Sequence, residues 1–249
     1  MFVFNPLRRV FCINYQIFRI FMTFIENRVG VEVESQTPKS KLTRQVFDNP
    51  RGIDGVEKDV LVESLLAVAT DGFMRQADGL LYEDIYVHVF DCDRLTVITN
   101  ESGQALGFIA ANVGLKEDKV LYHLGGIILM EEIQGKGVAK GFLAQELAEC
   151  GADVMCFHTQ SESMRRLGLS LAEPNLGLAV ELFGDSCVLD YLDSGQAVER
   201  GRYYSRYGGS LYGDVGRFGD KAITDPGFDF LGGDAIVFAG FVRKGGSGE

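Results

Sequence analysis

The sequence contains few of the residues that build metal and disulfide sites. Its 249 residues include three histidines and five cysteines, and the cysteines are widely scattered without Cys-x-x-Cys spacing. Three histidines are too few for a histidine-rich metal site, and an odd number of scattered cysteines is typical of reduced core thiols in a cytosolic-type compartment. We therefore expect no metal site, no disulfide framework and a cytoplasmic location.

The chain also lacks an excess of positive charge and a long uncharged apolar run. Lysine and arginine number 24 against 35 acidic residues, which gives a formal net charge of −11 at pH 7. This balance argues against general nucleic-acid binding, and it suits either a cationic amine partner or simply a soluble surface. No uncharged apolar run reaches the length of a membrane-spanning helix, so we expect no transmembrane segment.

Residues 1–25 are aromatic and basic, with no acidic residue before Glu26. Their polar residues are spaced by three and four and would form one stripe on a helix. Four interpretations remain open: the helix docks on the domain, it contacts a membrane surface, it is an organelle presequence, or translation begins at Met22. We treat residues 1–41 as an N-terminal extension, an amphipathic helix followed by a polar linker.

Two common phosphate-binding motifs are absent from the most glycine-rich turn. A Walker A loop needs Ser or Thr after Gly-Lys, but Gly137 follows Lys136; a dinucleotide fingerprint needs a third glycine where Lys140 stands. What is present is a β-rich apolar run over residues 120–130, then the turn, then a helical pattern. Such a strand, turn and helix direct unpaired backbone N–H groups and the positive end of the helix dipole at one anion site.

The turn reads Gln134-x-x-Gly137-x-Ala139, which resembles the Arg/Gln-x-x-Gly-x-Gly/Ala signature of the GNAT superfamily of N-acetyltransferases. The resemblance implies that this turn holds the pyrophosphate of acetyl-CoA, the co-substrate. It also implies an α+β fold: a mixed, mostly antiparallel sheet flanked by helices and splayed between its fourth and fifth strands, with acetyl-CoA in the splay. The alternative is an ordinary strand-to-helix turn that uses glycines for its geometry.

The order of the predicted elements fits that fold. We expect, in chain order, a strand over residues 42–47, helices over 59–68 and 77–86, strands over 95–99, 105–113 and 120–130, a helix after the turn, a strand over 153–159, a helix over 162–171 and a last strand over 235–242. We expect one acyltransferase domain over residues 42–243 and a flexible tail over 244–249. A glycine- and tyrosine-rich insert over 201–219 is either a roof over the acceptor site or a flexible loop.

The resemblance implies cofactor contacts at three places. The backbone of the strand pairs with the pantetheine arm at Ile127, Ile128 and Leu129. The turn and first helical residues hold the pyrophosphate at Gln134, Gly135, Lys136, Gly137, Val138 and Ala139, and Lys140 adds a positive charge. Ser161 stands about where the family commonly has an asparagine that contacts pantetheine.

One histidine is the candidate base for the chemistry. Alternation along the strand predicts that Leu121, His123, Gly125 and Ile127 share a sheet face, and His123 titrates near neutrality. A core histidine is the alternative, and we expect His158 to be structural.

The leaving thiolate needs an acid, and the tyrosine that the family often has in the helix after the second splayed strand is missing here. Tyr203 and Tyr207 of the insert are the candidates. We therefore predict an N-acetyltransferase that moves acetyl directly to a small-molecule amine or an exposed protein amino group in a ternary complex. The alternative is a non-catalytic acyl-CoA-binding or regulatory module on the same fold.

Overall fold

The computed structural model describes residues 41–244. The amphipathic helix expected within residues 1–25 lies outside the described residues, as does the tail beyond 244. The strands are β1 (Thr43–Asp48), β2 (Arg94–Thr99), β3 (Ala105–Lys116), β4 (Lys119–Leu129), β5 (Val154–Thr159), β6 (Ala172–Pro174), β7 (Leu189–Tyr191), β8 (Ala197–Glu199) and β9 (Ala235–Val242). The helices are α2 (Gly55–Gly72), α3 (Gly79–Phe90), α4 (Val138–Glu149), α5 (Glu162–Leu171), α6 (Leu176–Phe183), α7 (Tyr204–Tyr207) and α8 (Val215–Phe218), with short 3-10 turns η1 (Pro50–Gly52), η2 (Glu131–Ile133) and η3 (Gly219–Lys221).

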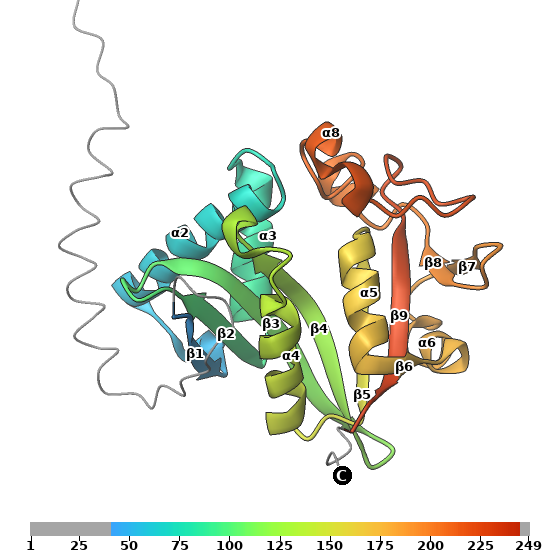
Figure 1. The fold of residues 1–249 in the computed structure, drawn as a ribbon, viewed down its shortest axis with the longest axis horizontal. Coiled ribbons are helices and arrows are strands. Elements are labelled where there is room, and N and C mark those ends of the chain that lie inside the picture. The colour runs from blue at the N-terminus through green and yellow to red at the C-terminus, as the bar shows by residue number, and fades with distance from the viewer. Residues whose placement is uncertain (1–40, 245–249) are drawn as a thin grey trace, which may run out of the picture.

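The strands form one mixed sheet in the order β1-β2-β3-β4-β5-β9-β8-β7, and β6 pairs with β9. All pairings are antiparallel except that of β4 with β5, which is parallel. The α4 and α5 helices pack on one face, and α2, α3 and α6 pack on the other (Figure 1). The predicted α+β fold with a mostly antiparallel sheet is confirmed.

The predicted helices and strands are present in the structure, with small shifts at their ends. The helix over 162–171 and the strand over 235–242 have the predicted bounds, whereas α3 begins two residues later than expected. Its start is set by Asp78, whose side chain accepts a hydrogen bond from the N–H of Leu81 at 2.8 Å. The short strands β6 and β8 were not predicted, since three residues carry too little pattern.

A bulge in β4 corrects one prediction. Ala110 of β3 pairs with Gly126 and Ala111 pairs with Leu124, so Gly125 is an extra residue in β4. The extra residue shifts the alternation, because two residues of one strand then oppose one of its partner. Ile127 packs on the α4 side of the sheet with Tyr122 and Leu124, which flank His123 in the strand, so it does not share the face of His123. The prediction that these two side chains share a face is therefore wrong.

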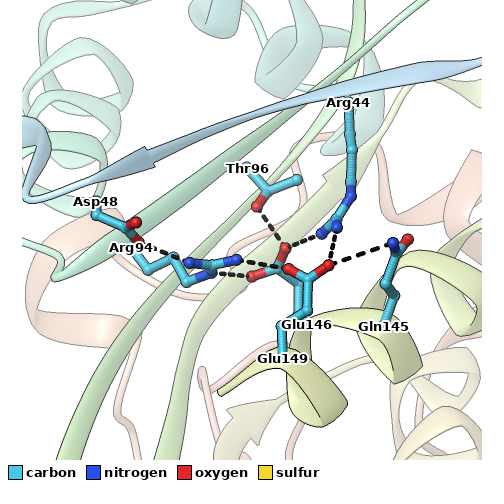
Figure 2. Close-up of polar contacts among 7 residues, drawn as sticks. All are labelled: Arg44, Asp48, Arg94, Thr96, Gln145, Glu146 and Glu149. Carbon is cyan, nitrogen blue, oxygen red and sulfur yellow. Dashed lines mark hydrogen bonds and ion pairs between the residues drawn. The ribbon is translucent and has the colours of Figure 1, made fainter. Parts of the chain in front are cut away.

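A buried ionic cluster attaches α4 to the first two strands (Figure 2). Glu146 is 0% exposed and accepts hydrogen bonds from Arg44 Nη1 at 2.6 Å, Arg94 Nε at 2.6 Å and Thr96 Oγ1 at 2.8 Å. Glu149 contacts both arginines from the next turn of the helix. A carboxylate with three such donors is well satisfied, so the cluster fixes the position of α4 and of the turn before it.

Candidate functional site

The sheet opens between β4 and β5 (Figure 1). The two strands pair only at Leu121–Val154, Tyr122–Met155 and His123–Cys156, although β4 continues to Leu129 and β5 to Thr159. Beyond these three positions, no strand within residues 41–244 pairs with the edge of β4 that faces β5. The predicted splay between the fourth and fifth strands is confirmed, and His123 lies at the last paired position.

The turn after β4 leaves its amides accessible. Gly135 and Gly137 have φ values of +72° and +77° and are exposed, and a Cβ at either position would meet nothing within 4 Å. Gly137 is the N-cap of α4, and no side chain from the described part of the chain caps this helix. The first amides of α4 therefore lack intrahelical acceptors and point away from the helix, as an anion site requires.

Gln134 and a distant lysine define one side of this turn. The Gln134 side chain donates from Nε2 to the carbonyl of Leu129 at 2.7 Å, and its Oε1 accepts from Lys221 Nζ at 3.1 Å. Lys221 comes from η3, 87 residues further along the chain. This contact adds a positive charge beside the turn that the sequence pattern did not reveal.

Ser161 has a structural role in this structure. It is 5% exposed, and its hydroxyl caps α5 by accepting a hydrogen bond from the N–H of Met164 at 3.3 Å. A hydroxyl used in this way has less capacity for a ligand. The expected contact of Ser161 with pantetheine stays a prediction.

A cavity of about 380 Å³ occupies the splay, a size within the usual range for small-molecule sites. Its walls come from β4, from the end of β5 with Gln160, from α3 and from residues 199–212. Of the predicted cofactor residues, Ile127 and Ile128 line it, and the turn at 134–140 follows beyond the end of β4. The cavity also contains all three predicted catalytic residues: His123, Tyr203 and Tyr207.

The glycine- and tyrosine-rich insert roofs this cavity. On the β5 side, Gln160 is 1% exposed and its Oε1 accepts from Leu211 N at 2.8 Å and Ser210 Oγ at 3.2 Å. On the opposite side, the amides of Gly213 and Asp214 donate to the carbonyls of the α2–α3 loop. The insert therefore spans the opening between the two halves of the sheet and covers this cavity; that the cavity is the acceptor site stays a prediction.

Burial sets the protonation of His123. Desolvation, followed by the positive charges of His158, Arg202 and His88, lowers the pKa of His123 from 6.5 to about 4. At neutral pH the imidazole is uncharged and has a free lone pair. It can accept a proton, although its low pKa makes it a weaker base than an exposed histidine.

The two candidate tyrosines differ in their contacts. The Tyr207 hydroxyl donates to Asp84 Oδ2 at 2.5 Å, and burial raises the pKa of Tyr207 to about 12. Burial also raises the pKa of Tyr203. Both hydroxyls stay protonated at neutral pH, but the proton of Tyr207 is held by the carboxylate of Asp84, so Tyr203 is the better candidate for proton donation.

Sequence reasoning missed several charged residues that line the cavity. His158, expected to be structural, lines it together with Glu199 of β8. The other charged or titratable residues that line the cavity and were not predicted are Asp84, His88, Arg202 and Arg206. The i, i+4 spacing of the first two on one helix was an available signal, whereas nothing local connects α3 with β8, more than 100 residues away.

The lowered histidine pKa predicts a pH-dependent stability. Between pH 6.5 and about 4 the unfolded chain binds a proton at residue 123 that the folded chain does not, so the free energy of unfolding falls as the pH falls. We expect His123 to contribute a loss of about 2 kcal/mol between pH 7 and pH 5. Urea denaturation at both pH values measures it. A His123→Gln variant should lose that part of the dependence, and an unchanged slope would contradict the low pKa.

None of the helices within residues 41–244 combines the length and apolar character that crossing a membrane requires.

No protein-family model matches the sequence, and no curated protein matches it. Solved structures with a similar fold include several acetyltransferases, one of them described as a GNAT family N-acetyltransferase. One from Escherichia coli, in complex with CoA, is 16% identical, with 58% of this chain and 74% of that chain covered and a TM-score of 0.41. The IAA acetyltransferase of Bacillus cereus is 13% identical, with 81% and 100% covered and a TM-score of 0.43. The NatC complex bound to Gag peptide and CoA is 10% identical, with 80% and 99% covered and a TM-score of 0.37.

Proposed function

We propose that this protein is an N-acetyltransferase that moves an acetyl group from acetyl-CoA to an amine, by direct transfer in a ternary complex. The observation that carries the proposal is the parting of β4 and β5 after three paired positions, with an open glycine turn at the end of β4. A strand edge, free amides and a helix N-terminus then lie along one path, which suits a thioester arm that ends in a diphosphate.

In this proposal the backbone of Ile127, Ile128 and Leu129 pairs with the pantetheine arm. The amides of the turn at 134–139 hold the pyrophosphate, and Lys140 and Lys221 add positive charge. In the described part of the chain no strand pairs with this edge on the β5 side, so its N–H and C=O groups need a partner. A bound pantetheine would supply one.

The acceptor amine would enter the cavity beneath the roof, where His123 takes its proton and Tyr203 protonates the leaving thiolate. Acetyl leaves the CoA sulfur and bonds to the amine nitrogen, one proton leaves the nitrogen and one is delivered to sulfur, so the reaction balances. The proposal for Tyr203 fails if a Tyr203→Phe variant releases CoA thiol at the wild-type rate. The acceptor is a small-molecule amine or an exposed protein amino group.

The test of the whole proposal is a thermal-shift screen with CoA, acetyl-CoA and longer acyl-CoA thioesters, with ATP as a control anion. Selective binding to the folded protein should raise the melting temperature with the CoA compounds in a concentration-dependent way. Thiol release over a panel of amines then measures turnover. An absence of any shift with CoA compounds would overturn the proposal.

The second candidate is a non-catalytic acyl-CoA-binding module. The contact that favours it occupies a candidate catalytic group, namely the Tyr207 hydroxyl on Asp84. This candidate predicts tight CoA binding without thiol release for any amine in the panel. The same two assays therefore separate the two functions.

A Gly137→Ala substitution should weaken CoA binding about 10-fold. An alanine at φ +77° costs about 1–2 kcal/mol, so the turn shifts to another conformation and the amides no longer converge. Titration calorimetry with CoA measures the loss. Gly141→Ala is the matched control, because Gly141 lies in α4 with nothing within 4 Å of its Cβ position. It should leave affinity unchanged and stabilise the helix by about 0.5–1 kcal/mol, and equal affinities of the two variants would contradict the assigned turn.

A further inference from the structure

Three potential metal ligands meet beside the cavity at a point that the proposed transfer does not use. They are His158 of β5, Glu199 of β8 and Cys187 from the loop between α6 and β7. One ligand atom of each lies within 4.8 Å of the other two. The three segments are separate in sequence but adjacent in the sheet region formed by β5, β9 and β8 (Figure 1).

The imidazole of His158 lacks a satisfactory partner. Its side chain is 7% exposed, and its Nε2 lies 3.0 Å from Glu199 Oε2 without the alignment of a hydrogen bond. Nε2 has no other hydrogen-bond partner among residues 41–244. A buried nitrogen whose one contact is poorly aligned is incompletely satisfied, so its presence needs an explanation. A cation bound by this nitrogen and by the carboxylate would give the nitrogen a well-directed partner.

The carboxylate of Glu199 has one oxygen to offer. Arg202 Nη1 donates to Glu199 Oε2 at 2.6 Å, and this is also the oxygen that faces His158. A metal bound to one oxygen would therefore take the other, Oε1, and leave the contact with Arg202 in place.

The ligand types select the ion. Thiolate and imidazole with one carboxylate suit Zn²⁺, whereas Mg²⁺ and Ca²⁺ prefer sets made of oxygen alone. Ligand atoms of a tetrahedral zinc site lie roughly 3.5 Å apart, given bond lengths of about 2.0–2.3 Å. The observed cluster needs only small side-chain movements to reach that geometry.

We propose that His158, Cys187 and Glu199 form a zinc site, with a fourth position left to water or to a ligand from the cavity. The sequence analysis predicted no metal site, because these residues are far apart and resemble no ligand motif. Since His158 and Glu199 also line the cavity, the ion would fix the wall that β5 and β8 give to it.

The test uses the full chain, freed of metal by a chelator, and titrated with Zn²⁺ against a chromophoric competitor. We expect one tightly bound Zn²⁺ and a rise in melting temperature with zinc but not with Mg²⁺. Co²⁺ should give a thiolate-to-metal charge-transfer band in the near ultraviolet. Cys187→Ser should abolish that band and weaken zinc binding more than about 100-fold, since even outer-shell changes cost about 10- to 100-fold.

Cys150→Ser is the matched control, because Cys150 is a similarly half-buried free cysteine at the end of α4. It should keep both the band and the affinity. Glu199→Gln is a second ligand variant that keeps the shape of the side chain, and circular dichroism of the metal-free variants confirms that they fold. The proposal is overturned if zinc does not bind, or if it binds to Cys187→Ser as it does to the wild type. Neither outcome bears on whether CoA binds at the turn.

Discussion

Replacing Glu146 by alanine should lower the free energy of unfolding by about 3–5 kcal/mol. The substitution removes the fully buried carboxylate that pairs with Arg44, 5% exposed, and with the partly buried Arg94; it leaves both of them the partly exposed Glu149, and Arg94 also Asp48. Breaking a buried ion pair from one side is costly, because the charge that remains in a region of low dielectric constant is then less well compensated. Denaturant unfolding at neutral pH, analysed as a two-state transition, measures the change.

Glu149→Ala is the matched control. Glu149 contacts the same two arginines, but its side chain is 36% exposed, so its loss should cost about 1 kcal/mol or less. If the Glu146 variant does not fold, Glu146→Gln keeps the shape and removes only the charge. If the two alanine variants lost the same free energy of unfolding, burial of the carboxylate would not determine how much it stabilises the protein. Since α4 carries the anion turn, CoA affinity should fall with the Glu146 variant as well.

Replacing His123 by alanine should lower kcat by about 10²–10⁴-fold with little change in CoA affinity. His123 lines the cavity at the last paired position of β4 and β5. In our proposal the strand edge and the turn hold CoA and His123 does not, so its loss should affect the chemical step and not the binding of CoA. Thiol release at saturating acetyl-CoA measures kcat, and calorimetry measures affinity. A fall in both to the same degree would indicate a structural role.

The pH profile sharpens this test. Because burial holds the pKa of His123 at about 4, the base is unprotonated above that pH. The acidic limb of kcat/KM should therefore lie near pH 4 and not near 6.5, once reversible unfolding has been excluded by returning samples to pH 7. A limb at 6.5 would mean that another group, or a more exposed histidine, takes the proton.

Tyr122→Phe is the matched control for His123. The neighbouring Tyr122 is 0% exposed in the core beneath α4, and its hydroxyl has no hydrogen-bond partner among the described residues. Removing that hydroxyl leaves no polar group unsatisfied, so activity should be unchanged and stability unchanged or higher. Loss of activity in this variant would mean that any disturbance of β4 affects the transfer.

The sequence predicted the elements well where the pattern was long or the turn chemistry local. The strand over residues 120–130 (β4, Lys119–Leu129, in the structure), the glycine turn and the following helix were predicted from residues that are close in the chain. The Gly125 bulge was not predicted, because an extra residue is recognised only by comparing β4 with its partner strand. The predicted sheet face of Ile127 was wrong for the same reason.

The same difference between neighbouring and distant residues applies to the candidate site. His123 and the tyrosines of the insert were named in advance, whereas Lys221, Glu199 and Asp84 were not. Each of these three reaches the site from an element that is distant in sequence, and short charged segments resemble any solvated surface. The roof role of the insert was left open, because glycine and tyrosine suit a flexible loop and a packed lid equally well.

The amino-acid sequence by itself determined the strand, the open turn and the helix after it, because positive φ at glycine and free amides at a helix start are properties of neighbouring residues. Only the tertiary structure decided at which residue β4 and β5 stop pairing, which side chains enclose the cavity and why a glutamate lies buried under α4. These depend on the register between strands and on contacts across 50 to 123 residues of chain. Such contacts form when the sheet and helices pack, and no local pattern encodes them.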